Sequence, residues 1–163
     1  MTTLFGGAAR ISSAIGIAIA LLAPLPAAAK DASVERRLDE VGLTYKVDDD
    51  GDYRITYNYK KEGRSQLVFV SGDTESVAGA LVREVFSPAA VLSKDDVSGR
   101  ALDLLKDSGG KKVGAWEVRG GVLYFVIKVP EPVSGPQLEK FMDLAASIAD
   151  NKEIEVSGSR DGL

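Results

Sequence analysis

The spacing of apolar residues changes several times along the chain, and each change marks a predicted element. From residue 33 onward, stretches with apolar residues three or four positions apart alternate with stretches in which every second residue is apolar. The first spacing is typical of amphipathic helices and the second of strands with one buried face. The pattern predicts the order helix, four strands, helix, two strands, helix, which is an α+β fold with an antiparallel sheet.

Three segments have helical spacing. Ser33 can cap the first, and Ser93 can cap the second, whose apolar side is expected to comprise Val97, Ala101, Leu104 and Leu105. The third begins at residues 134–137 with capping-box spacing and a proline in its first turn. Its expected buried stripe consists of Leu138, Phe141, Met142, Ala145, Ile148 and Ala149. Residues 150–158 are predicted to be a short ordered segment, with its acids alternating on a terminal strand, and residues 159–163 a frayed tail.

Six segments have strand-like patterns: residues 43–47, 53–59, 66–70, 80–87, 113–118 and 122–129. The stretch 77–86 also fits a helix, but Gly79 weakens that interpretation, and Pro88 is expected to end either element. A strand over about 80–87 is therefore favoured. The pair Gly120-Gly121 predicts a tight hairpin turn between the last two strands, because glycine accepts positive φ angles.

Two predicted strands, residues 67–70 and 122–127, are apolar on both faces. An antiparallel sheet normally leaves one face wet, so this pattern predicts a second cover, either a homodimer partner or a bound polypeptide. The candidate partner-binding residues are Val122, Tyr124, Val126 and Trp116. For Trp116, a position in the core remains the alternative to a binding role.

The first 29 residues have the three-part layout of a secretory signal peptide. Arg10 precedes an apolar stretch from Ile11 to Ala23, which is shorter than the roughly 20 residues of a spanning helix. Two prolines and then the triplet Ala27-Ala28-Ala29 predict cleavage before Lys30. We expect a single domain over residues 30–158, in the periplasm or secreted and with no stable membrane span after cleavage. A leader retained as an anchor is the alternative.

Composition narrows the function. Of the 20 basic and 24 acidic residues, only Arg10 lies in the leader, so the chain after cleavage carries a formal charge of −5, which argues against nucleic acid as a partner. The sequence contains neither cysteine nor histidine. Disulfides, thiol nucleophiles, imidazole-based triads and ordinary zinc sites are thereby excluded, and nothing in the sequence implies a cofactor.

Acidic residues provide the remaining candidate chemistry. The segment Asp48–Asp52 invites a calcium-binding interpretation, but Lys46 and Tyr57 occupy the first and last ligand positions of such a loop. A structural hairpin turn is therefore favoured, and no metal site is predicted. Paired carboxylates, Asp95 with Asp96 or Glu153 with Glu155, could serve a periplasmic hydrolase, which is the alternative function.

Several motifs together resemble the YbjN family: Leu43-Thr44-Tyr45, Asp49-Asp50-Gly51-Asp52-Tyr53, Gly63-Arg64-Ser65-Gln66 and Arg83-Glu84-Val85-Phe86-Ser87-Pro88. The glycine-turned hairpin and the last helix are similar too, so the resemblance spans about residues 33–158. It implies a fold like that of type III secretion chaperones, which dimerise and hold partner polypeptides on apolar surfaces. It brings no catalytic residues. We therefore expect a non-catalytic periplasmic module that binds a protein or peptide.

Overall fold

Three helices and seven strands make up residues 32–60 and 62–157, which a computed structural model describes. The predicted leader and the predicted tail lie outside these residues. The elements in chain order are α1 (Ala32–Glu40), β1 (Tyr45–Val47), β2 (Tyr53–Tyr59), β3 (Arg64–Val70), β4 (Glu75–Val77), β5 (Ala80–Val91), α2 (Lys94–Gly110), β6 (Ala115–Arg119), β7 (Val122–Pro130) and α3 (Gly135–Ser157).

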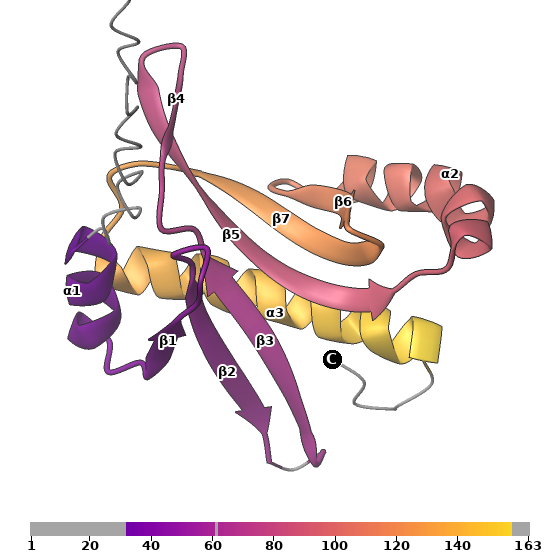
Figure 1. Cartoon of the computed structure of the whole chain (residues 1–163), viewed down its shortest axis with the longest axis horizontal. Coiled ribbons are helices and arrows are strands. Elements are labelled where there is room, and N and C mark those ends of the chain that lie inside the picture. Colours follow the sequence, from indigo (N-terminus) through magenta and orange to yellow (C-terminus); the bar gives the residue numbers. More distant parts are fainter. Residues whose placement is uncertain (1–31, 61, 158–163) are drawn as a thin grey trace, which may run out of the picture.

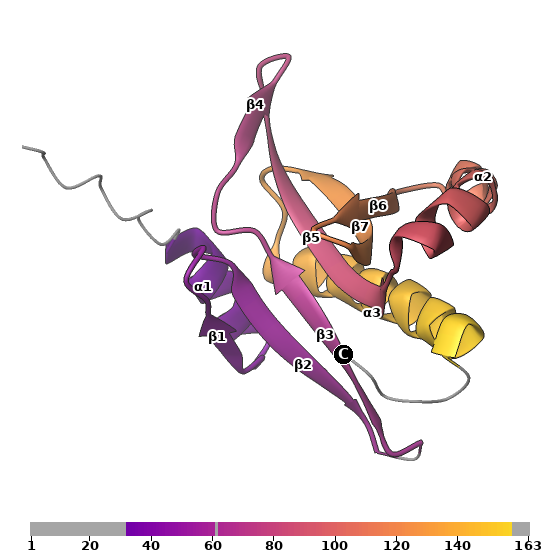
Figure 2. The ribbon, with the colours of Figure 1, turned by 45° about the vertical axis from the view of Figure 1, so that its right-hand side comes forward.

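All seven strands join one antiparallel sheet, in the order β1-β2-β3-β5-β7-β6, with β4 paired only to β5. Helix α3 crosses one face of this sheet, and α1 lies beside α3 at the end of the sheet where β1 lies (Figure 1). Helix α2 lies at the opposite end, against the edge strand β6 (Figure 2). The α+β class and the antiparallel pairing are thus confirmed. No helix among the described residues is long and apolar enough to cross a membrane.

The core lies between α3 and the sheet. Leu138, Met142, Ala145 and Ala149 of α3 are fully buried against the side chains of β3, β5 and β7. The predicted capping box is confirmed, because Ser134 N–H donates to Gln137 Oε1 at 2.9 Å and Gln137 N–H donates to Ser134 Oγ at 3.4 Å. The fixed start of α3 directs its apolar stripe along the sheet.

All six predicted strands exist, and the hairpin turn between β6 and β7 is confirmed by φ angles of 57° at Gly120 and 83° at Gly121. The sequence pattern missed β4. This strand pairs with the first residues of β5 and forms with them a hairpin arm, residues 75–82, that projects from the sheet (Figure 1). Val77 and Leu81 of the arm are each half exposed. Because β4 has no buried face, its sequence lacks the alternation of apolar and polar residues that would predict a strand.

The prediction that Pro88 ends its strand is wrong. Strand β5 continues to Val91, and its register against β7 shifts between Pro88 and Ala90. A bulge tolerates proline because a residue there need not donate to the ladder. Beside Pro88, β5 leaves β3: these two strands pair only at Phe69↔Phe86 and Val70↔Val85.

The prediction of a terminal strand after residue 150 is also wrong, because α3 continues to Ser157. Asp150 forms an ion pair with Arg64 of β3, and Lys152 Nζ lies 2.6 Å from Glu155 Oε2. Contacts at helical spacing and with the sheet thus outweigh the alternating sequence pattern. Glu153 is 4 % exposed in this last part of the helix.

The expected apolar side of α2 is buried only in part. Leu104 is half buried, whereas Leu105 and its neighbour Leu102 are 65 % and 71 % exposed. The side chain of Val97 lies outside the described part. Helix α2 touches the body mainly through β6, so most of its apolar surface has no partner among the described residues.

A buried ion cluster connects α1, β5 and the segment before α3. The Glu131 carboxylate accepts hydrogen bonds from Arg37 Nη1 at 2.8 and 3.0 Å and from Arg83 Nε at 2.7 Å. Burial raises the pKa of Glu131, but the hydrogen bonds and charges of the two arginines outweigh burial and hold it below its ordinary value. The cluster fixes the base of the hairpin arm, because Arg83 also donates to the carbonyl of Ser71.

Candidate functional site

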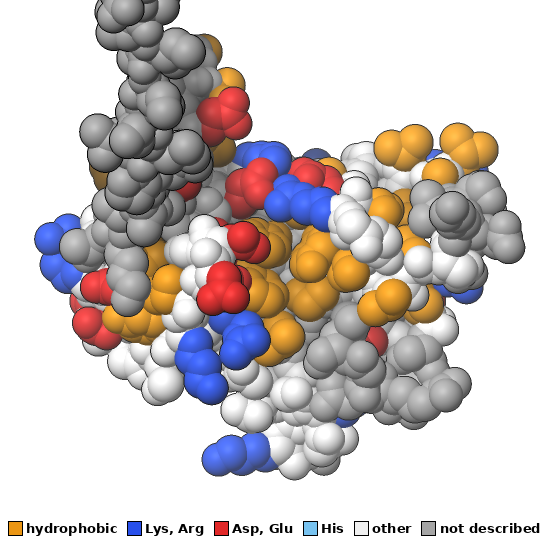
Figure 3. Space-filling model, in the orientation of Figure 1, with side chains coloured by type: hydrophobic (Ala, Val, Ile, Leu, Met, Phe, Trp, Pro, Cys, Tyr) orange, Lys and Arg blue, Asp and Glu red, His pale blue; other side chains and the backbone are white. Residues whose placement is uncertain are grey.

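The candidate site is the sheet face opposite α3, called the open face below. Val68 and Val70 of β3 are buried on the α3 side, so Phe69 between them points to the open face. Phe69 pairs in register with Phe86 of β5, and Phe86 pairs with Val126 of β7. These side chains therefore form a row across three strands. Figure 3 looks onto this face and shows hydrophobic side chains at its centre.

The rings on the open face contact one another. Phe69 and Phe86 are stacked, with centroids 5.1 Å apart and planes 7° apart. Tyr124 meets Phe86 edge-on at 5.8 Å and 77°. The Arg119 guanidinium lies 5.5 Å from the Phe86 ring centre. Val126 beneath them is 1 % exposed, while the three rings are half buried, so the rings form an ordered apolar surface that remains partly accessible.

A network of four charges borders these rings on β5, β7 and β6. Arg119 lies 2.8 Å from Glu84 and 2.5 Å from Glu117, and Lys128 pairs with both acids. Burial raises the pKa of Glu84, but Arg119 and Lys128 lower it further and hold it below its ordinary value. Each charge in the network has two partners, so this border carries no unpaired charge.

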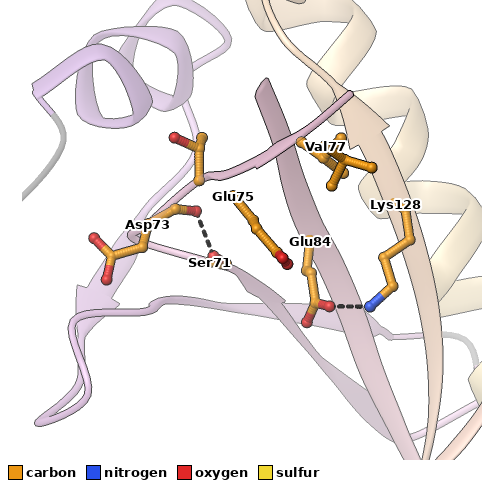
Figure 4. Close-up of a pocket in the computed structure, with 8 residues that line it drawn as sticks. Ser71, Asp73, Glu75, Val77, Glu84 and Lys128 are labelled. Atoms are coloured by element: carbon orange, nitrogen blue, oxygen red, sulfur yellow. Dashed lines mark hydrogen bonds and ion pairs between the residues drawn. The ribbon is translucent and has the colours of Figure 1, made fainter. Parts of the chain in front are cut away.

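A pocket of about 450 Å³ lies where the hairpin arm leaves the open face. Val77 and Val82 line it together with Glu75, Glu84 and Lys128. Figure 4 shows the Glu84 carboxylate bonded to Lys128 and the Glu75 side chain directed into the same hollow. The pocket thus extends the open face from the aromatic rings to the base of the arm.

Three of the four predicted contact residues share the open face. Val122, Tyr124 and Val126 alternate along β7, and their neighbours Leu123 and Phe125 are buried on the α3 side. Trp116 lies on the opposite face from Tyr124, because it pairs in register with Phe125. The structure therefore separates Trp116 from the other three.

Trp116 packs between α2 and the core. Its ring meets Phe125 edge-on at 5.1 Å, and its Nε1 donates to Asp107 of α2 at 2.6 Å. Lys152 lies 5.7 Å from the ring centre. The pKa of Asp107 is lowered mainly by the hydrogen bond from Trp116. These contacts correspond to the core alternative for this residue.

Sequence reasoning missed Phe69 and Phe86. The alternation in β3 contains the signal for Phe69, since Leu67 and Phe69 share one face and Val68 and Val70 the other. Phe86 could not be placed without the pairing of β5, which depends on the bulge after Pro88. The aromatic row is therefore a product of register and not of any one strand's pattern.

Two carboxylates of the acidic turn between β1 and β2 accept hydrogen bonds from backbone N–H groups. Asp48 Oδ1 accepts the backbone N–H groups of Asp50 at 3.1 Å and Asp52 at 2.9 Å, and Asp52 Oδ1 accepts that of Gly72 at 3.0 Å. Burial is the main cause that raises the pKa of Asp52. Within residues 32–60 and 62–157, no group of three or more metal-ligating side chains is placed to hold a metal ion.

Of the two carboxylate pairs considered for a hydrolase, the structure describes the side chains of Glu153 and Glu155, and it does not bring these two together. Glu153 and Glu155 lie two positions apart on α3, and residues at this spacing do not face each other on a helix. Glu153 is buried, and Glu155 is exposed and bound to Lys152. The side chains of Asp95 and Asp96 lie outside the described residues.

No family model matches the sequence, and the search of curated proteins finds no match.

Proposed function

We propose that this protein is a non-catalytic module that binds a polypeptide segment of a partner protein on its open face. One observation carries the proposal: the half-buried rings of Phe69, Phe86 and Tyr124, which lie over Val126, have no helix of the described residues above them, although α3 covers the other face of the same strands. Contiguous apolar surface of this kind marks interaction sites in soluble proteins.

The shape of the open face favours a polypeptide as the occupant. The rings span three strands, which are about 4.8 Å apart, so the apolar surface is about 10 Å wide. An extended segment presents every second side chain to one side, and these side chains repeat at about 6.7 Å. Two or three of them fit over the rings, and Tyr124 is of the residue type that most often dominates the energy of such contacts.

The predicted leader supports a periplasmic location for this binding. The resemblance to the YbjN family supports a chaperone-like role and the more specific fold of type III secretion chaperones. Both remain predictions. The mass of the exported protein tests the first: we expect a chain that begins at Lys30, and a mass equal to that of residues 1–163 would contradict cleavage.

Selection from a displayed library of random 12-residue peptides on the purified protein tests the binding proposal. The most enriched peptide is synthesised and its affinity is measured by calorimetry. We expect Tyr124→Lys to weaken binding at least tenfold, because it places a charge among the rings. Val122→Lys, at the first residue of β7, provides a second variant on the same face.

The matched control is Leu102→Lys, since Leu102 is an exposed apolar residue of α2, away from the open face. It should bind the peptide as the parent protein does. Circular dichroism establishes that each variant is folded. Failure of the parent to enrich any peptide, or equal affinities for the parent and both β7 variants, would reject the proposal.

A further inference from the structure

Two cations lie on the open face next to the aromatic rings. Lys46 of β1 and Arg54 of β2 are directly opposite each other in the antiparallel register, and Arg54 is in turn the register partner of Phe69. Both side chains are exposed. The row of residues that crosses the sheet therefore begins with two positive charges and continues into Phe69, Phe86 and Val126.

This arrangement leaves two charges unbalanced. Like charges directly opposite each other on neighbouring strands destabilise a sheet. Among the residues described, no acid forms an ion pair with Lys46 or Arg54, whereas Arg119 and Lys128 at the other side of the face each have two acidic partners. The repulsion between Lys46 and Arg54 would be relieved by an anion that arrives from outside.

The surroundings of the two cations suit a carboxylate. A hollow of about 260 Å³ lies beside them and is lined by Thr44, Thr56 and Asn58 as well as by Lys46 and Arg54. The hydroxyl and amide groups can donate hydrogen bonds to an acidic oxygen. A guanidinium such as that of Arg54 can bind both oxygens of one carboxylate.

We infer that the polypeptide bound by the open face carries an aspartate or glutamate side chain next to its apolar residues. The carboxylate lies between Lys46 and Arg54, and the apolar side chains lie on Phe69, Phe86 and Tyr124. Neighbouring strands are about 4.8 Å apart, and alternate side chains of an extended segment repeat at about 6.7 Å. The side chain two positions from the acid therefore reaches Phe69 on β3, and the next ones on the same side of the segment reach Phe86 on β5 and Tyr124 on β7. The inference rests on the proposed function and adds the chemistry of the partner.

Peptide selection with reversed charges tests this inference. The same random 12-residue library is selected on the parent, on the double variant Lys46→Glu, Arg54→Glu, and on the control Lys112→Glu, Lys140→Glu. The control changes the net charge equally at two exposed lysines outside the open face. We expect the parent and the control to enrich Asp or Glu beside apolar residues, and the reversed variant to enrich Lys or Arg there.

Calorimetry with the acidic peptide gives the size of the effect. The reversed variant should bind it at least tenfold more weakly than the parent does. Raising the salt from 50 to 500 mM should weaken binding to the parent by about threefold, because exposed charges are screened. The single variant Lys46→Glu should raise the thermal midpoint by about 1–3 °C, since it converts the repulsion into an ion pair.

The outcomes separate this inference from the proposed function. Enriched peptides that lose affinity with Tyr124→Lys but contain no preferred acid, in the parent and the reversed variant alike, would overturn the inference alone. If the reversed variant binds the peptide as the parent does but aggregates, the two cations serve to protect the edge of the sheet from association. That result would also overturn the inference. A parent with the mass of two copies in sedimentation, reduced to one by Tyr124→Lys, would identify a second copy as the occupant and overturn both.

Discussion

Phe69 and Phe86 lie ring against ring, 7° from parallel and 5.1 Å apart, on the face of the sheet that no described helix covers. They also form one of the only two residue pairs at which β3 and β5 are in register, the other being Val70↔Val85. The stacked rings therefore lie at the narrow junction between the β1-β2-β3 part of the sheet and the β5-β7-β6 part. The open face depends on this junction for its shape.

Two neighbouring residues of β7 should respond differently to substitution. Phe125 is fully buried on the α3 side, so Phe125→Ala should lower the free energy of unfolding by about 3–5 kcal/mol. Tyr124 faces the other way, and Tyr124→Lys should cost about 1 kcal/mol or less, mainly through the lost contact with Phe86. Urea unfolding measures both. Equal losses in the free energy of unfolding would show that Tyr124 belongs to the core, and would contradict the accessibility of the open face.

Beside the junction, β3 and β5 no longer pair through their backbones, and the side-chain amide of Gln66 connects the two strands instead. Its Nε2 donates to Ser87 Oγ at 2.9 Å and to the Pro88 carbonyl at 2.7 Å, at the point where β3 and β5 separate. Gln66 is 2 % exposed, so Gln66→Leu would leave a buried carbonyl without its donor. We expect a loss of about 1–3 kcal/mol in urea unfolding. No loss would indicate that the two strands separate without help from this side chain.

The cluster around Glu131 should make stability depend on pH. Because the pKa of Glu131 lies below its ordinary value in the folded protein, its contribution is fully present above that ordinary value and is lost as pH falls through the lowered pKa. Glu131→Gln should cost about 3 kcal/mol at pH 7, since it removes the anion that Arg37 and Arg83 share.

Chemical denaturation at pH 7 and pH 3 measures this effect. The difference in stability between the parent and Glu131→Gln should be smaller at pH 3 than at pH 7, because pH 3 lies nearer to the lowered pKa of Glu131, below which the parent also loses this charge. Glu155→Gln provides the control, because Glu155 is exposed and its one ion pair within the described residues is with Lys152. A difference that stays constant between the two pH values would contradict the assignment of the charge to Glu131.

The sequence was sufficient to predict the helices and six of the strands, because their patterns are local. The alternation in β7 and the apolar stripe of α3 each identify a buried face without knowledge of any neighbour. The two-sided apolar character of β3 and β7 also predicted that a second face would need cover. This is the part of the candidate site that sequence reasoning could reach.

The remainder depends on pairing between distant residues. Whether Pro88 ends a strand is decided by the bulge and by Gln66, which lies 22 residues away. The end of α3 is decided by contacts such as Asp150 with Arg64, which outweigh the alternation that suggested a strand. The opposite faces of Trp116 and Tyr124 follow from the register of β6 against β7. None of these relationships appears in a short sequence window.

The central claim is that the open face binds a polypeptide, and amide chemical shifts in the ¹⁵N-labelled protein test it most directly. The protein is titrated with the peptide most enriched from the random library. We predict that the largest shifts fall on Phe69, Phe86, Tyr124 and Val126 and that Leu102 and Leu105 of α2 do not change. Shifts centred on α2, with the four residues of the open face unaffected, would contradict the claim.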